Sequence, residues 1–218
     1  MGFSFLTQAL IASHLPDVTG STLLSKLGYP VGFLIVILGS QQLFTENTLT
    51  AVIPLLAHRT SSALRGVIRL WSVVLIANLV GGFLFVILLT IEGLVEPAIT
   101  TEFDRIGRNA FARSWLHTML FGVLAGWLIA MMVWMLPAAR SAGVIVIFVV
   151  TYVVGLADMP HIVVGSIDVF YLVATGVEDI GHVLGSYMLP TLLGNIIGGV
   201  ALVSALNHAQ VVAGEDDH

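Results

Sequence analysis

The stretch GSQQLFTENT, residues 39–48, places two glutamines, two threonines, a glutamate and an asparagine in the middle of a long apolar region. It follows YPVGFLIVIL and precedes LTAVIPLLA. Hydrocarbon offers no hydrogen-bond partners, so non-helical backbone and polar groups at membrane depth must face protein or a water-filled path. We therefore predict that a membrane helix is interrupted here and that the polar side chains of the stretch point inward.

Composition indicates an integral membrane protein. Of the 218 residues, 57% are hydrophobic and only 10% are charged, and the mean hydropathy is +1.01. A soluble domain carries about 25% charged residues. The formal net charge of −5 is modest, and no basic patch with interleaved aromatic residues predicts a nucleic-acid partner. The chain has no cysteine, which excludes disulfides, thiol nucleophiles and thiolate metal sites, and no cofactor or metal is implied.

The hydropathy pattern predicts six spans, since a membrane helix needs roughly 20 mostly apolar residues. Three spans are continuous and two are interrupted, at 66–91, 115–136, 183–207, about 27–57 and about 141–175. The opening segment, residues 1–15, is apolar but too short to cross alone, and we expect further residues before Met1. The connections are too short for a soluble domain, so we expect one membrane domain over 1–218. The longest connection, residues 92–113, has room for a surface helix.

The two interruptions occupy equivalent places. QQLFTEN interrupts the second of the first three spans, and LADMPH, residues 156–161, interrupts the second of the last three. Three is an odd number, so the second half should enter the membrane inverted relative to the first. Paired broken helices in corresponding places of inverted halves are the best sequence indication of a transport site. Thr45 in the first break and His161 in the second are expected to meet there.

Several polar residues near the breaks have two interpretations. Glu46 and Asp158 each flank a break, so each is expected either to cap the N-terminus of a half-helix or to relay protons. Asn195, in the last span, is expected either to satisfy backbone groups left open at a break or to face the pore.

Three segments together resemble the formate/nitrite transporter family. GSQQLFTENT resembles the looped second helix of that family, ADMPHIVVGS resembles its broken fifth helix with a central histidine, and LPTLLGNIIGGV resembles its sixth-helix signature. Within the family the sequence is most similar to the YfdC-like branch. The resemblance implies an all-α, aquaporin-like protomer in a homopentamer. It also implies a bacterial inner-membrane location with both termini cytoplasmic. The resemblance alone gives this orientation, because the numbers of Lys and Arg residues on the two sides of the membrane are equal and do not decide it.

The resemblance assigns roles to individual residues. His161 matches the central histidine, and Asn195 matches the asparagine of the sixth helix. The matches to pore-narrowing or constriction positions are Leu43, Phe44, Thr45, Tyr29 and Phe33. The chain departs from the family pattern where a lysine and two asparagines are replaced by Ala110, Gly126 and Gly165. These departures put ordinary formate or nitrite selectivity in doubt.

The chemistry of such a site follows from its residue types. An anion that crosses an apolar constriction pays a large desolvation penalty, which falls if the anion is protonated on the way. Histidine titrates near working pH, so His161 is the expected proton donor, with Thr45 selecting which ring nitrogen carries the proton. Leu43 and Phe44 would form a dry constriction that excludes hydrated ions. The sequence thus predicts a channel-like transporter of small monovalent anions or their weak acids.

Enzymes and neutral-solute channels are the other classes of membrane protein to which the residues could belong. Ser166 with His161 or His182 has the residue types of a serine hydrolase but no flanking glycine pattern, and the His-Glu-x-x-His motif is absent, so we expect no enzyme. A water or glycerol channel would be expected to carry paired Asn-Pro-Ala loops, which are also absent. A neutral small-solute pore nevertheless stays open as an alternative, as does a non-conducting structural relative.

Overall fold

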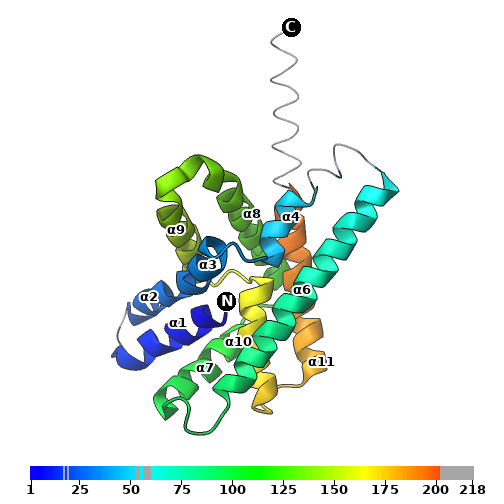
Figure 1. Cartoon of the computed structure of the whole chain (residues 1–218). Helices are drawn as coiled ribbons and strands as arrows, with labels where there is room; N and C mark the ends of the chain where they lie inside the picture. The colour runs from blue at the N-terminus through cyan, green and yellow to red at the C-terminus, as the bar shows by residue number, and fades with distance from the viewer. Residues whose placement is uncertain (17, 19, 53–54, 56–59, 202–218) are drawn as a thin grey trace.

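The computed structural model describes residues 1–16, 18, 20–52, 55 and 60–201, and the described part is helical (Figure 1). The N-terminal elements are α1 (Gly2–His14), α2 (Ser21–Ser25), the 3₁₀ turn η1 (Lys26–Gly28), α3 (Tyr29–Leu38) and α4 (Phe44–Thr50). The central elements are α6 (Ser61–Leu89), α7 (Pro97–Asn109), α8 (Trp115–Ala139), η2 (Arg140–Ala142) and α9 (Gly143–Leu156). The last are α10 (Ile162–Ala174), α11 (Ile180–Val183) and the π-helical turn η3 (Leu184–Met188), which continues as helix over 189–201.

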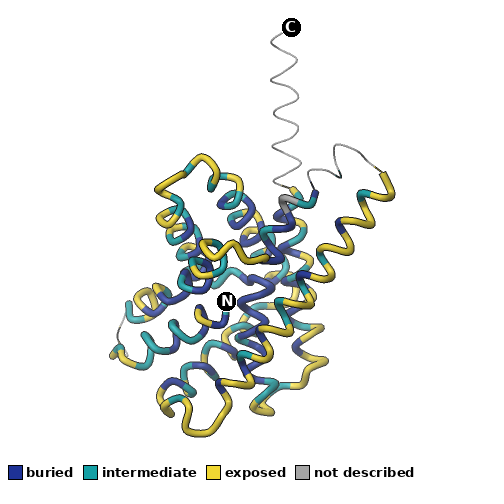
Figure 2. The backbone as a smooth tube through the Cα atoms, viewed as in Figure 1, coloured by how far each residue is buried: buried dark blue, intermediate teal, exposed yellow. Residues whose placement is uncertain are grey.

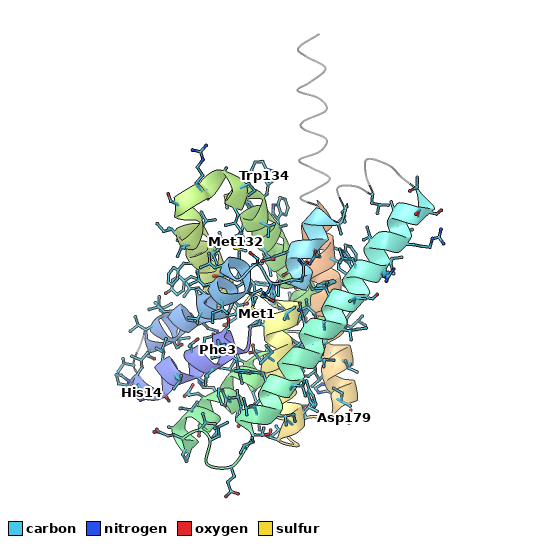
Figure 3. All side chains as sticks on the ribbon, viewed as in Figure 1. Met1, Phe3, His14, Met132, Trp134 and Asp179 are labelled. Carbon is cyan, nitrogen blue, oxygen red and sulfur yellow. The ribbon has the colours of Figure 1, made fainter. Side chains whose placement is uncertain are left out.

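Four helical runs in the described part are long and apolar enough to cross a membrane. They are Ser21–Leu38, Ser61–Leu89, Trp115–Leu156 and Ile180–Ala201. The run Trp115–Leu156 is a hairpin, because the chain turns at Arg140, whose φ is 45° (Figure 1). Trp134 lies near this turn, whereas Asp179 lies at the opposite end of the molecule (Figure 3).

The predicted spans and breaks correspond to the observed elements with few changes. Spans 66–91 and 115–136 coincide with α6 and α8, and the chain leaves helical conformation between α3 and α4 and between α9 and α10. The last predicted span, 183–207, extends beyond the described residues. Two connections are shorter than predicted, because α2 begins at Ser21 and α8 runs through Pro137.

The predicted surface helix in the third connection is α7. Its inward residues Ile99, Phe103 and Gly107 are buried against α1 and α10, and its charged residues point outward. This division makes α7 an amphipathic helix at one end of the bundle, rather than another span.

Apolar side chains cover the outside of the bundle as well as its interior. Helix α6 is exposed along much of its length in the single chain (Figure 2). Its exposed apolar side chains include Leu64, Ile68, Val73, Ile76, Val80, Leu84 and Leu88. A water-soluble monomer rarely exposes so large an apolar face. This face therefore belongs against lipid or a neighbouring subunit, which makes the chain an integral membrane protein.

Candidate functional site

The first break is a well-formed helix C-terminus. After α3 the chain turns at Ser40, whose φ of 53° lies in the left-handed region. The Ser40 N–H donates to the Ile37 carbonyl at 3.0 Å, and the Gln41 N–H donates to the Val36 carbonyl at 2.9 Å. This pair of bonds is the Schellman motif, which satisfies the last carbonyls of a helix. The polar stretch thus ends α3 with the Val36 and Ile37 carbonyls satisfied.

The second break repeats the first. Asp158, 118 positions after Ser40, also has a left-handed φ, of 46°. Its N–H donates to the Gly155 carbonyl at 3.1 Å, and the Met159 N–H donates to the Val154 carbonyl at 3.0 Å. Each donor and acceptor residue of the second break lies 118 positions after its counterpart in the first break. The two breaks therefore have the same local hydrogen-bond pattern. In this correspondence His161 matches Leu43 rather than Thr45.

One asparagine holds each break together from a neighbouring helix. Asn195 accepts from the Ile162 N–H at 2.8 Å and donates to the Pro160 carbonyl at 3.0 Å and the Gly122 carbonyl at 2.9 Å. Asn78 of α6 accepts from the Phe44 N–H at 3.0 Å and donates to the Gln42 carbonyl at 3.1 Å.

Of the two roles predicted for Asn195, the structure therefore shows backbone satisfaction. Sequence analysis missed Asn78, although a single asparagine in the apolar run WSVVLIANLV was a signal that could have found it.

His161 connects the two breaks. It is the N-cap of α10, where its Nδ1 accepts from the Val164 N–H at 3.3 Å, and its Nε2 lies 2.8 Å from the Thr45 hydroxyl. An Nδ1 that accepts carries no proton, so in the neutral ring the proton is on Nε2 and is donated to Thr45. The predicted contact between Thr45 and His161 is present, and the cap determines the tautomer.

An aromatic ring packs against this histidine. The Phe33 ring meets the imidazole edge-on, with centroids 5.1 Å apart, and the Tyr29 ring lies 5.5 Å from Phe33. Phe33, Leu43 and Phe44 are at most 1% exposed, as are Thr45 and His161. The structure thus brings the residues of both breaks together into a buried cluster, in which a histidine and a threonine are the polar members next to apolar side chains.

A cavity of about 450 Å³ leads to His161 from the end of the molecule where α7 lies. We call it the α7 vestibule. Four basic side chains line it, together with two aspartates: Lys26, Arg105, Arg108, Arg113, Asp158 and Asp168. Tyr29, Tyr187 and the buried His161 also line it. The vestibule therefore places charged and hydroxyl groups in the same cavity as the histidine.

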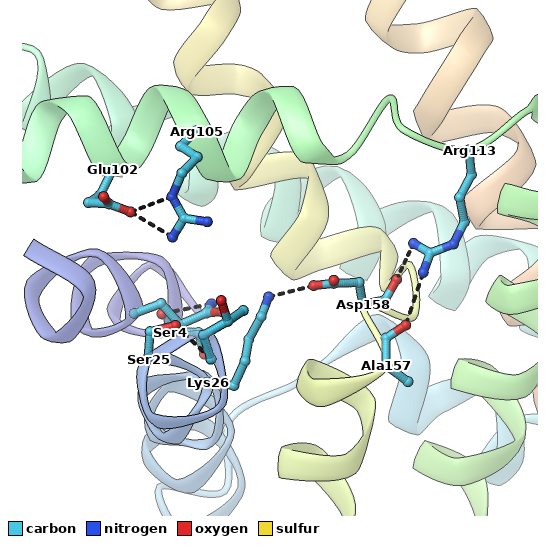
Figure 4. Close-up of polar contacts among 10 residues, drawn as sticks. Ser4, Ser25, Lys26, Glu102, Arg105, Arg113, Ala157 and Asp158 are labelled. Atoms are coloured by element: carbon cyan, nitrogen blue, oxygen red, sulfur yellow. Dashed lines mark hydrogen bonds and ion pairs between the residues drawn. The ribbon is translucent and has the colours of Figure 1, made fainter. Parts of the chain in front are cut away.

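Two basic residues hold the second break from the vestibule side (Figure 4). Lys26 Nζ lies 2.5 Å from Asp158 Oδ1, and Arg113 donates to the carbonyls of Asp158 at 2.8 Å and Ala157 at 3.1 Å. The positive charges suit the C-terminal end of α9, where helix carbonyls concentrate partial negative charge. The prediction that Asp158 caps the following half-helix is wrong, because Asp158 closes α9 and pairs with Lys26, whereas His161 caps α10.

Glu46 lies in the first turn of α4, where a negative charge complements the helix dipole. Asn78 accepts the hydrogen bond from the Phe44 N–H at the start of α4. A capping role for Glu46 therefore stays a prediction. In the part of the chain that the structure describes, no group of three or more His, Asp or Glu side chains could hold a metal ion.

Comparison with known proteins identifies the family. The family model for formate/nitrite transporters matches residues 1–209. The chain belongs to the formate/nitrite transporter family. It is 40% identical over 211 residues to the inner membrane protein YfdC of Escherichia coli K12, covering 97% of this chain and 68% of that protein. The formate channel BtFdhC of Bacillus thuringiensis is 25% identical over 215 residues, covering 93% and 79%.

A solved structure shows the same fold. A pentameric formate channel with formate bound superposes with a TM-score of 0.83 at 20% sequence identity, covering 97% of this chain and 92% of that one. The agreement extends over nearly the whole chain, so the overall helical fold is the same in both proteins.

Packing explains two departures from the family pattern. A Cβ on Gly126 would lie 2.4 Å from the Asn195 carbonyl oxygen, so the close approach of α8 to the last helix leaves no room for an asparagine. A Cβ on Gly165 would lie 1.9 Å from the Tyr187 hydroxyl, which occupies that space instead. Ala110 lines the α7 vestibule beside Arg108 and Arg113.

Proposed function

We propose that this member of the formate/nitrite transporter family is a channel-like transporter of small monovalent anions or their weak acids. The observation that carries the proposal is the buried histidine that lines the vestibule, hydrogen-bonded through Nε2 to Thr45 and packed against the Phe33 ring. A hydrated anion would lose its water there at a large energetic cost, whereas a neutral acid would lose much less.

His161 is the group that would exchange the proton. Its Nε2–H points to Thr45, and its Nδ1 is engaged by the Val164 N–H. A proton taken up at Nδ1 would displace the cap of α10, so the charged ring would be a transient proton carrier. Phe33, Leu43 and Phe44 would form the constriction, with Tyr29 on its vestibule side. Glu46, in the first turn of α4, would border the path on the α4 side.

The membrane arrangement is part of the same proposal. We place the single domain, residues 1–218, in the bacterial inner membrane as a homopentamer with both termini cytoplasmic. Each protomer would consist of two inverted three-helix repeats. The identical hydrogen bonds at Ser40 and Asp158 and the matching asparagines Asn78 and Asn195 support this repeat. The exposed apolar face of α6 supports contact with lipid or a second copy.

A neutral small-solute pore is the second candidate. Ala110, Gly126 and Gly165 replace polar residues of the family, which removes a positive charge and two amides from the path. A pore without these groups would bind an anion less well while still admitting a solute such as glycerol.

Uptake by proteoliposomes tests the proposal. Purified protein is reconstituted, and entry of formate, nitrite, lactate, hydrosulfide and glycerol is compared with that into protein-free vesicles. Acid-stimulated uptake of one or more of the weak acids supports the proposed function. Uptake of glycerol alone supports the neutral-solute pore, and no uptake of any solute contradicts both and indicates a non-conducting relative.

A further inference from the structure

Asp168 is a carboxylate in the α7 vestibule without a partner of its own. It lies on α10 two turns after His161, so both side chains belong to the same face of the helix and line the same cavity. Its Oδ1 is buried, and among the described residues it has no hydrogen-bond partner. Buried polar groups are normally hydrogen-bonded, so this atom is available to a ligand.

The Tyr187 hydroxyl lies close to Asp168. The π-helical turn Leu184–Met188 brings the Tyr187 ring inward, where the residue is 4% exposed. A Cβ on Gly165 would lie 1.9 Å from the Tyr187 hydroxyl, and Gly165 is one helical turn before Asp168 on α10. π-Helical turns often occur at functional sites. The vestibule thus presents a hydroxyl group and a carboxylate beside each other.

The basic residues of the vestibule already have partners. Lys26 pairs with Asp158 and Arg105 with Glu102, and Arg113 donates to the carbonyls of Ala157 and Asp158 (Figure 4). Arg108 pairs with Asp104. Three of the four cations are paired with carboxylates, Arg113 is held by neutral carbonyls, and the Asp168 Oδ1 has no hydrogen-bond partner among the described residues. Like charges at close range repel each other strongly in a poorly hydrated site. A bare anion is therefore disfavoured in the part of the vestibule next to Asp168.

We propose that Asp168 and Tyr187 bind the permeating weak acid in its undissociated form. The acid and the Asp168 carboxyl would share the single proton that the acid brings, and the acid carbonyl would accept from the Tyr187 hydroxyl. An anion that arrives without this proton would be repelled by the ionised Asp168. This inference rests on the proposed function and deepens it, because it places the selection for the neutral acid in the vestibule, before the solute reaches His161. The other titratable or charged groups lining the cavity are Lys26, Tyr29, Arg105, Arg108, Arg113, Asp158 and His161.

The test is formate uptake by proteoliposomes at mildly acidic and at neutral pH, for the wild type, Asp168→Asn and Tyr187→Phe. The control is Glu92→Gln, which removes an exposed acid that does not line the vestibule. Asp168→Asn should lower the ratio of acidic to neutral uptake about tenfold, the usual weight of a hydrogen bond to a charged group. Tyr187→Phe should lower uptake at acidic pH several-fold, and Glu92→Gln should leave the ratio unchanged.

The outcomes separate the two proposals. Absence of uptake by the wild type would overturn the proposed function and, with it, this inference. If the wild type takes up formate and Asp168→Asn keeps the wild-type ratio, only the inference is overturned. Should Asp168→Asn not assemble, Tyr187→Phe alone decides, because unchanged acidic uptake in that variant also contradicts the inference.

Discussion

Asn195 should be one of the costliest polar side chains to remove. In Asn195→Ala, the Ile162 N–H and the Pro160 carbonyl lose the partner that the structure gives them, in a site that is fully buried. The Gly122 carbonyl also loses Asn195, but it lies within α8 and keeps its place in the helix. The substitution therefore leaves one backbone donor and one backbone acceptor of the second break without a partner.

The magnitude follows from the number of groups left unpaired. A buried donor or acceptor without a partner costs about 1–3 kcal/mol, so Asn195→Ala should lower the free energy of unfolding by about 2–6 kcal/mol. Asn78→Ala leaves the Phe44 N–H and the Gln42 carbonyl without Asn78, which is the same number of backbone groups, and should also cost about 2–6 kcal/mol. A similar cost at both asparagines is the sharper prediction.

Denaturant titration of the detergent-solubilised protein, followed by tryptophan fluorescence, measures both values. Asn109→Ala is the matched control, since this asparagine is exposed at the end of α7 and makes no bond that holds a break. The account of the breaks would be refuted if Asn195→Ala were no more destabilising than Asn109→Ala.

Three further predictions concern contacts around the site. Thr45→Val keeps the side-chain volume but leaves the imidazole N–H without an acceptor, and should cost about 1–3 kcal/mol in the same titration. Gly165→Ala should cost about 1–3 kcal/mol through its clash with the Tyr187 ring and hydroxyl, and a cost that is not reduced in the Tyr187→Ala background would contradict that reason. Lys26→Met and Asp158→Asn should couple by about 0.5–3 kcal/mol in a double-mutant cycle, and additive effects would show that the pair contributes nothing.

Sequence patterns located the two breaks because polar residues inside an apolar span leave few alternatives in a membrane. The same reasoning brought Thr45 and His161 together, because broken helices at equivalent places must meet at the centre. The Thr45–His161 hydrogen bond needed no further information. The residue types alone did not predict at which residue each half-helix begins.

The role of Asp158 shows why register was not predictable. An aspartate before a helix is usually a cap. Here its left-handed φ makes it the turn residue that ends α9, and the helix starts three residues later with His161 as the cap. The buried position of Tyr187 could not be predicted for a similar reason, because the π-helical turn at Leu184–Met188 interrupts the regular helical period. Both features depend on tertiary packing rather than on local propensity.

The most direct test of the central claim is the pH dependence of weak-acid uptake by His161→Asn. Asparagine is a strong N-cap residue, so it can keep the bond to the Val164 N–H while removing the group that titrates. We expect a folded protein whose acid-stimulated uptake is lost and whose stability falls by about the 1–3 kcal/mol of the Thr45 bond, whereas His161→Ala should lose the cap as well and be destabilised further. A His161→Asn protein with the uptake and pH profile of the wild type would contradict the account, because the histidine would then serve only as a cap.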